Sequence, residues 1–358
     1  MAKPNKNIVF YLLSWLYGGI TQFRNFLFDA KILSSTSFQL PIISIGNLAV
    51  GGTGKTPHTE FLLNILGKDW KTAVLSRGYK RQTKGYRLAN KNDTAKTIGD
   101  EPFQIYSKFP NTAVAVAEKR VIGIENLLKE KPEIEVILLD DAYQHRHVKP
   151  GLSILLTEFN KLYSDDYMLP YGSLREWKSN NKRADIIIVT KCDEEINTTK
   201  RQEIEKKLNI KPHQQLFFST FRYGKLYAGF ENDNKQKTAE LDAESHILLW
   251  TGIENPQPMW NFFQEYTSKI TPMFFPDHHD FTEKEIEKID EIFLNLPEKK
   301  LIITTEKDLS RLKSNEFLTE NIRKNLFVLP LEVKILNNEH KVFTETIKDY
   351  VTKNSRNS

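Results

Sequence analysis

With 358 residues, the chain is long enough for two or three domains at about 150 residues per domain. Hydrophobic residues make up 39% of it, and 51 lysines and arginines against 46 aspartates and glutamates give a net charge of +5. This composition excludes a disordered chain, a collagen-like repeat and a polytopic membrane protein. The single cysteine, Cys192, excludes a disulfide framework and a multi-cysteine metal site and fits a reducing compartment. The slight basicity suits an anionic partner, which is a nucleotide, an anionic lipid or a nucleic acid.

The first predicted element is an uncharged apolar run, Ile8–Ile20, with lysines before it and Arg24 after it. At about 1.5 Å per residue it would span about 20 Å, which is less than the roughly 30 Å core of a bilayer. We therefore predict a helix within residues 1–30, with two alternatives for its surroundings. It either packs on the next domain or lies in a membrane interface with its aromatic residues at the boundary, namely Tyr11, Trp15, Tyr17, Phe23 and Phe26.

Strand patterns alternate with helix patterns through most of the chain, which is typical of an α/β fold with a parallel sheet. The first series occupies residues 31–225 and begins with the buried strand Pro41–Asn47. A polar stretch, Glu231–Glu240, reads as a loop near a boundary. A second series occupies residues 226–340, and residues 341–358 read as a terminal helix and tail. We therefore expect a larger and a smaller α/β domain.

A glycine-rich loop, Ala49–Thr56 (AVGGTGKT), follows the first strand and precedes a predicted helix. This is the context and the pattern of a phosphate-binding loop, whose backbone N–H groups surround phosphate oxygens. Lys55 would reach the β- and γ-phosphates, and the Thr56 hydroxyl would coordinate Mg²⁺. The predicted nucleotide-binding residues are Ala49, Val50, Gly51, Gly52, Thr53, Gly54, Lys55 and Thr56.

An apolar strand that ends in two carboxylates, Glu135–Asp141 (EVILLDD), follows later in the chain. This layout places a carboxylate beside the metal ion of a nucleotide site. Asp140 and Asp141 are therefore predicted metal ligands together with Thr56, and the sequence does not decide which of the two binds directly. Aspartate is also common at strand-end turns, but the phosphate loop upstream favours the metal role.

The tetrapeptide Thr190-Lys191-Cys192-Asp193 follows another predicted strand, Ala184–Val189. It is similar to the T-K-x-D motif with which P-loop GTPases read guanine. A GTPase switch or a metallochaperone is therefore an alternative to a kinase. The motif fixes only three positions, so chance matches to it are common.

A larger constellation outweighs that motif. In chain order, IGNLAVGGTGKTP (45–57), SRGYKR (76–81), GDEP (99–102) and DDAYQHR (140–146) resemble the tetraacyldisaccharide 4'-kinase family, the lipid A kinases of Gram-negative bacteria. LRE (174–176), DHH (277–279) and TEKD (305–308) match further motifs, so the resemblance covers about residues 42–312. The chain departs from the family at Ala49, commonly Thr, and at Ala142-Tyr143, commonly Gly-Phe. A glycine at 142 would allow a backbone angle that alanine resists.

The resemblance implies transfer of the γ-phosphate of ATP, with Mg²⁺, to the 4'-hydroxyl of a tetraacyldisaccharide 1-phosphate. It implies a P-loop NTPase-type parallel sheet domain with a second, smaller α/β/α domain over the site. It also implies a place on the cytoplasmic face of the inner membrane, peripheral or anchored by the N-terminus. The expected partners are the lipid substrate and the inner-membrane surface, with no nucleic acid and no obligate protein partner.

The resemblance also assigns site residues. A sugar hydroxyl is a poor nucleophile at pH 7, so the reaction needs a base, and the family motifs place an aspartate–histidine pair on Asp100 and His278. His278 is preferred to His279 because the family motif is D-H-x. The pair is 178 residues apart in sequence, so domain closure would assemble it. Lys55 and Asp141 complete the expected catalytic set.

Three further residues are candidates for phosphate or substrate contacts, namely Arg77, Gln144 and Arg175. Arg77 belongs to a basic cluster that either receives the lipid's 1-phosphate or anionic headgroups or is a solvated loop. Lys307 and Asp308 are expected to fix a turn of the smaller domain rather than to take part in the chemistry.

Overall fold

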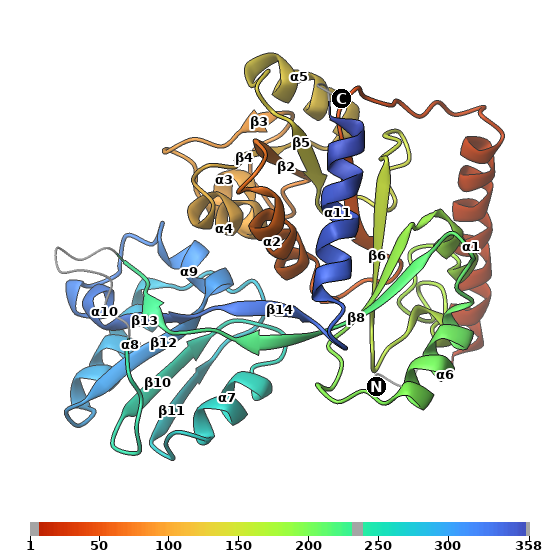
Figure 1. The fold of residues 1–358 in the computed structure, drawn as a ribbon. Helices are drawn as coiled ribbons and strands as arrows, with labels where there is room; N and C mark the ends of the chain where they lie inside the picture. Colours follow the sequence, from red (N-terminus) through yellow and green to blue (C-terminus); the bar gives the residue numbers. More distant parts are fainter. Residues whose placement is uncertain (1–6, 231–238, 356–358) are drawn as a thin grey trace.

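A computed structural model describes residues 7–230 and 239–355 and shows two lobes, each built on its own β-sheet (Figure 1). Most of the predicted boundary loop at 231–240 lies outside the described residues. The predicted α/β fold, with a large parallel sheet domain and a smaller second domain, is confirmed.

The large lobe contains a nine-stranded sheet in the order β14-β8-β7-β6-β1-β5-β2-β4-β3. Its pairs are parallel except at the two edges, where β3 and β14 run antiparallel to their neighbours. Parallel strands bring their carboxyl ends to one edge of the sheet, where ligands bind in this class of fold. The strands are β1 (Ile42–Asn47), β2 (Thr72–Ser76), β3 (Arg87–Leu88), β4 (Ala113–Val116), β5 (Val136–Leu139), β6 (Leu152–Glu158), β7 (Ile186–Thr190), β8 (Gln215–Tyr223) and β14 (Leu331–Ile335).

Helices of the large lobe connect these strands or lie at the ends of the chain. They are α1 (Ile8–Asp29), α2 (Lys55–Leu66), α3 (Ala95–Ile98), α4 (Asp100–Lys108), α5 (Arg120–Glu130), α6 (Thr198–Leu208) and α11 (His340–Asn354), with short 3₁₀ turns at Tyr163–Asp165 and Lys178–Arg183. No helix in the described ranges is long and apolar enough to cross a bilayer.

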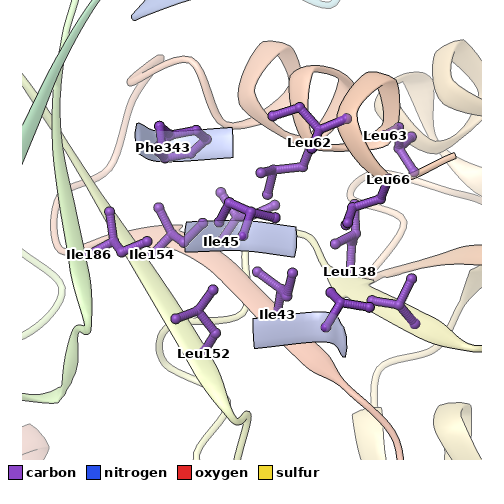
Figure 2. Close-up of a cluster of buried hydrophobic side chains, with 14 of the residues drawn as sticks. Ile43, Ile45, Leu62, Leu63, Leu66, Leu138, Leu152, Ile154, Ile186 and Phe343 are labelled. Atoms are coloured by element: carbon purple, nitrogen blue, oxygen red, sulfur yellow. The ribbon is translucent and has the colours of Figure 1, made fainter. Parts of the chain in front are cut away.

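A buried apolar cluster holds together β1 and α2, the strand before the phosphate loop and the helix after it (Figure 2). Ile43 and Ile45 of β1 lie against Leu62 of α2, and Phe343 of α11 joins them from the far end of the chain. All four side chains are 2% exposed or less. Truncating a buried side chain of this size to alanine costs about 2–5 kcal/mol, so the cluster holds strand and helix in one relative position.

The small lobe contains a five-stranded sheet in the order β11-β10-β12-β13-β9, with helices beside it. All neighbours are parallel except β9, which runs antiparallel to β13. Its elements are β9 (Tyr227–Ala228), β10 (His246–Thr251), α7 (Gln257–Gln264), β11 (Ile270–Phe274), α8 (Glu283–Asn295), β12 (Lys300–Thr305), α9 (Glu306–Leu312), α10 (Glu320–Asn325) and β13 (Leu326–Leu329).

Two adjacent segments join the lobes. The chain leaves β8 for the small lobe and returns into β14, and the N–H of Gly224 donates a 3.0 Å hydrogen bond to the carbonyl of Pro330 at the crossing. The structure corrects one sequence boundary here. Because β14 pairs with β8 in the large sheet, the small lobe ends near Pro330 and not at residue 340.

Helix α1 packs with an unusual orientation. Its buried residues are Ser14, Gly18, Asn25 and Phe28, whereas large apolar side chains face outward. Side-chain bonds hold it on the lobe, for example a 3.1 Å bond from Asn25 Nδ2 to Glu176 Oε2. The outward residues are Ile8, Val9, Tyr11, Leu12, Leu13, Trp15, Leu16, Ile20, Phe23 and Phe26.

Candidate active site

The phosphate loop lies between β1 and α2, as predicted. Gly51 has φ 113° and Gly54 has φ 87°, which are angles that L-residues with side chains rarely adopt. A Cβ on Gly54 would also collide with the ring of Phe221. Two hydrogen bonds hold the loop in place. The N–H of Val50 donates to the Ser173 carbonyl at 2.8 Å, and the Thr190 hydroxyl donates to the Thr53 carbonyl at 3.0 Å.

The two acidic residues follow β5 directly and differ in their surroundings. Asp140 is 4% exposed and accepts a 3.1 Å hydrogen bond from Thr59, and burial together with the charge of Asp141 raises its pKa to about 6. Asp141 lies 3.9 Å from Lys55 Nζ and 2.9 Å from Arg175 Nη2. Burial pushes the Asp141 pKa upward, but these two cations hold it below its ordinary value.

Backbone strain marks this turn as well. Asp141 has φ 46°, a left-handed conformation that costs of order 1–3 kcal/mol in a residue with a side chain. Ala142 does not share it, since it is absent from the positive-φ residues of the described chain. Alanine at position 142, where the family commonly has glycine, therefore requires no strained backbone angle.

Asn47, the last residue of β1, connects the acidic pair with the phosphate loop. Its Oδ1 accepts hydrogen bonds from Lys55 Nζ at 3.3 Å and from Arg175 Nη2 at 2.5 Å. Its carbonyl accepts a 2.9 Å bond from Gln144 Nε2. Two of the three predicted substrate residues therefore lie at the phosphate loop. Sequence reasoning assigned no role to Asn47, although its position at a strand end just before the loop is the signal that would have found it.

Arg120 is a second residue without a predicted role. It is 2% exposed at the start of α5, and one terminal nitrogen donates to the Ala117 carbonyl. Its Nε and Nη2 have no hydrogen-bond partner among the described residues. Burial lowers its pKa to about 10, against the nearby charges of Asp140 and Asp141. The group stays protonated at neutral pH and adds a positive charge beside the acidic pair. Arg77 is exposed on the loop after β2 and acts on Arg120 through its charge.

Asp100 and His278 meet across the two lobes. Nδ1 of His278 lies 2.8 Å from Oδ2 of Asp100, the first residue of α4. His278 has φ 63°, so its backbone is strained like that of Asp141. Burial pushes the Asp100 pKa upward, but the hydrogen bond from His278 and the guanidinium of Arg311 hold it below its ordinary value. His279 bonds to Glu285 instead, with 2.9 Å between Nε2 and Oε2.

Helix α9 supplies the partners of this pair. Arg311 donates from Nε to Oδ2 of Asp100 at 2.8 Å and from Nη1 to Asp308 at 3.0 Å. Asp308 is fully buried and accepts from Thr251 at 2.9 Å, so it fixes a turn of the small lobe as expected. Lys307 differs from expectation, because its Nζ lies 3.2 Å from Nε2 of His278 and 2.8 Å from Asp277. Lys307 and Arg311 are four residues apart and therefore lie on one face of the helix, and this spacing can be read from the sequence.

A cavity of about 110 Å³ opens beside the pair. Three cations in its lining, Lys80, Lys96 and Arg311, outnumber the two carboxylates Asp100 and Asp280. The ring of Tyr79 meets His278 edge to face at 6.0 Å between centroids. Gly99, just before Asp100, has φ 98° and approaches Gly78 so closely that a Cβ there would lie 3.1 Å from its Cα. This contact places the start of α4 on the loop after β2. The lining includes Tyr79, Lys80, Gln82, Lys96, Asp100 and His278.

The TKCD segment lies at the carboxyl end of β7. Thr190 is fully buried and bonds to the phosphate loop, Lys191 pairs with Glu158 at 3.2 Å, and Cys192 is buried. Asp193 is exposed. The threonine of this motif therefore has a structural role at the phosphate loop that requires no guanine base.

Together, the parallel sheet, the glycine loop after β1 and the paired carboxylates after β5 define a P-loop nucleotide-binding protein with a second lobe over the site. Comparison with known proteins is more specific. The sequence profile of the tetraacyldisaccharide-1-P 4'-kinase family matches residues 7–352. The chain therefore belongs to this family.

Individual relatives agree. The chain is 48% identical to the tetraacyldisaccharide 4'-kinase of Bacteroides thetaiotaomicron over 97% of this chain and 94% of that protein. It is 46% identical to that of Phocaeicola vulgatus over 100% of this chain and 98% of the relative. A crystal structure of LpxK from Aquifex aeolicus in complex with ATP matches with a TM-score of 0.73 and 29% identity, over 95% of this chain and 98% of that one.

Proposed function

We propose that the chain transfers the γ-phosphate of ATP to the 4'-hydroxyl of a tetraacyldisaccharide 1-phosphate, with Mg²⁺, at the cytoplasmic face of the inner membrane. Family membership over residues 7–352 supports the reaction. The observation that carries the mechanism is the 2.8 Å contact between Asp100 and His278, because it brings an acid–base pair from two lobes to the side of the sheet that holds the phosphate loop.

The phosphate loop and its surroundings fit a nucleoside triphosphate. Lys55 and Arg175 supply positive charge, and the start of α2 directs backbone N–H groups at the loop. The donor set also fits Mg²⁺, which prefers oxygen ligands and takes only one or two carboxylates beside phosphate oxygens. Asp140 supports this fit, because a cation would stabilise a carboxylate whose pKa is raised to about 6. Thr56, Asp140 and Asp141 would hold the ion, and it would neutralise phosphate charge during transfer.

The pair Asp100–His278 acts as the base in this proposal. Lys307 faces Nε2 of the imidazole as a donor, so the ring proton resides on Nδ1 and is donated to Asp100. In the proposed reaction the sugar hydroxyl takes the place of the Lys307 ammonium group at Nε2, and the lone pair there accepts the hydroxyl proton. Asp100 stabilises the resulting imidazolium, and its lowered pKa keeps it ionised for that task.

The acceptor lipid carries a phosphate, and basic side chains outnumber acidic ones in the cavity beside His278. Arg77 is exposed on the loop after β2, and Lys80 and Lys96 line the cavity beside His278. Gln144 keeps a buried Oε1 without a hydrogen-bond partner among the described residues, so it has an acceptor to offer. We assign Arg77 and Arg175 to contacts with phosphates of ATP or of the lipid, and Gln144 to a contact with a hydroxyl group of the substrate, which can donate to Oε1.

Helix α1 is the proposed membrane contact. Its outward side chains include Leu12, Leu16 and Phe23, each more than 60% exposed, while its buried residues are Ser14, Gly18, Asn25 and Phe28. A helix with this orientation gains free energy when lipid covers its apolar face. The proposal therefore combines both sequence alternatives, since α1 packs on the lobe and presents its other face to the bilayer.

The proposed function is tested by phosphate transfer in mixed micelles. The protein is supplied with ATP labelled in the γ-phosphate and with the disaccharide 1-phosphate, and the control acceptor lacks the 4'-hydroxyl. We expect label in the first lipid only, and loss of transfer when Mg²⁺ is chelated. Label in the control acceptor, or full transfer without Mg²⁺, would contradict the proposal.

A further inference from the structure

The contact between the lobes contains a second charged cluster, away from the catalytic pair. Helix α4 of the large lobe packs against α9 of the small lobe, and we call this contact the seam. Asp100 is the first residue of α4, and Lys108 is the last. On α9, Glu306 is the first residue, and Arg311 lies near the end. Asp100 contacts Arg311 and Lys108 contacts Glu306, so the seam is charged at both ends.

Lys108 bridges the two lobes. Its Nζ lies 2.6 Å from Glu306 of the small lobe and 2.6 Å from Glu60 of α2 in the large lobe. The carboxylates are 4% and 6% exposed, whereas the lysine side chain is 30% exposed. Gln104 adds a 2.7 Å bond to Glu60, and the Tyr227 hydroxyl adds a 3.3 Å bond to Glu306. The cluster therefore joins the helix after the phosphate loop to α9, the helix whose Lys307 and Arg311 contact His278 and Asp100.

Within the large lobe Lys108 balances Glu60, whereas Glu306 of the small lobe depends on Lys108 across the seam for its cation. Two buried carboxylates share one ammonium group, so removal of the lysine would leave both without a cation. An uncompensated buried charge is strongly unfavourable, and the lobes would relieve it by moving apart and letting water reach Glu306. Two single segments of chain, at Gly224 and Pro330, connect the lobes and would permit such a movement.

We infer that Lys108 is a positioning residue, which holds α9 on α4 through Glu306 and Glu60 so that His278 stays on Asp100. The inference rests on the proposed function, because it assigns Lys108 to the base pair of that reaction. Lys108 itself touches none of the reacting groups that we assign. It acts through helix α9, on which Lys307 and Arg311 contact His278 and Asp100.

The kinetic test compares Lys108→Met with Lys108→Arg. We expect the methionine variant to lower kcat about 10- to 100-fold, since small displacements of catalytic groups have effects of this size. KM for ATP should stay within about 2-fold, because the large lobe alone forms the phosphate loop, and Lys108→Arg should recover most of kcat. Lys348→Met is the matched control, because Lys348 forms a 2.6 Å pair with Asp69 within the large lobe.

A second arm asks whether Lys108 acts through the base pair. In an Asp100→Ala background, adding Lys108→Met should lower kcat by less than about 2-fold, because the pair it positions is already absent. An equal loss in both backgrounds would overturn the inference, as would an unchanged kcat in the single variant. If Lys108→Met does not fold, Glu306→Gln removes the small-lobe partner and is judged by the same criteria.

A structural arm separates this inference from the proposed function. Nitroxide labels are attached at Lys129→Cys on α5 and Lys288→Cys on α8, both exposed, while the native Cys192 is buried. In the otherwise native chain we expect one narrow distribution of distances between the two labels. With Lys108→Met we expect a broader distribution that is centred at a longer distance. Identical distributions would overturn the inference. A changed distribution in a protein that never phosphorylates the lipid would overturn the proposed function and leave the seam intact.

Discussion

Arg311 in the small lobe donates a 2.8 Å hydrogen bond from Nε to Oδ2 of Asp100 in the large lobe. The same carboxylate oxygen faces Nδ1 of His278 at 2.8 Å. Both partners of Asp100 therefore come from the opposite lobe, and both lower its pKa against the effect of burial. The ionisation of the proposed base depends on contact between the lobes.

The first prediction concerns the pair itself. Asp100→Ala or His278→Ala should lower kcat about 10²- to 10⁴-fold, which is the usual contribution of a positioned base. ATP affinity, measured by calorimetry or by fluorescent nucleotide displacement, should change little because the phosphate loop is untouched. His279→Ala is the adjacent control and should retain most activity. Near-normal turnover in both pair variants would refute the assignment.

The second prediction concerns pH. Arg311 lowers the Asp100 pKa, so Arg311→Met should raise it. The reaction needs Asp100 in its ionised form. With a higher pKa, Asp100 stays protonated, and the enzyme stays inactive, up to a higher pH. The acidic limb of the kcat/KM profile should therefore move to higher pH, while the alkaline limb stays in place. A profile that falls in height without moving would show that Arg311 acts only on structure.

The third prediction concerns α1. Leu12→Glu with Leu16→Glu should weaken co-sedimentation with anionic vesicles at least 10-fold, since burial of each leucine is worth about 1.5–3 kcal/mol. The two side chains are 62% and 64% exposed, so the folded lobe should tolerate the change. Leu294→Glu, at a 60% exposed leucine on α8, is the matched control. Equal sedimentation of all three proteins would place the membrane contact elsewhere.

The fourth prediction concerns stability. Burial and the charge of Glu306 raise the Glu60 pKa above its ordinary 4.5, against the effect of Lys108. Above pH 4.5 the folded chain then binds more protons than the unfolded chain, so Glu60 lowers the free energy of unfolding as pH rises. From pH 5 to pH 8, Glu60→Gln should gain about 1–3 kcal/mol relative to the native chain in urea unfolding, at about 1.4 kcal/mol per pKa unit. If the difference in the free energy of unfolding between Glu60→Gln and the native chain does not change with pH, this explanation is wrong.

Sequence patterns predicted local features well. The strand before the phosphate loop was expected over Pro41–Asn47 and is found over Ile42–Asn47, because an apolar run before glycines leaves few alternatives. A helix was also expected within residues 1–30, and α1 spans Ile8–Asp29. The polar residues in its second half face the lobe, where Asn25 meets Glu176, and a hydropathy pattern cannot show that a buried face is polar.

Long-range arrangements were outside the reach of the sequence. β14 returns to the large sheet because β8 offers an unpaired edge, and nothing in Leu331–Ile335 itself specifies that partner. The cross-lobe partners Arg311, Lys307 and Glu306 lie in a segment that reads as an ordinary strand–helix turn. The pair Asp100–His278 was predicted only through resemblance to the family, since a separation of 178 residues leaves no local pattern.

One measurement tests the central claim most directly. The native protein is given the disaccharide 1-phosphate in micelles with ATP and, in parallel, with GTP, and phosphate at the 4'-position is quantified together with nucleotide hydrolysis. We predict ATP-dependent 4'-phosphorylation with little hydrolysis in the absence of lipid. A strong preference for GTP, with nucleotide hydrolysis and no phosphorylated lipid, would contradict the account and support a GTPase.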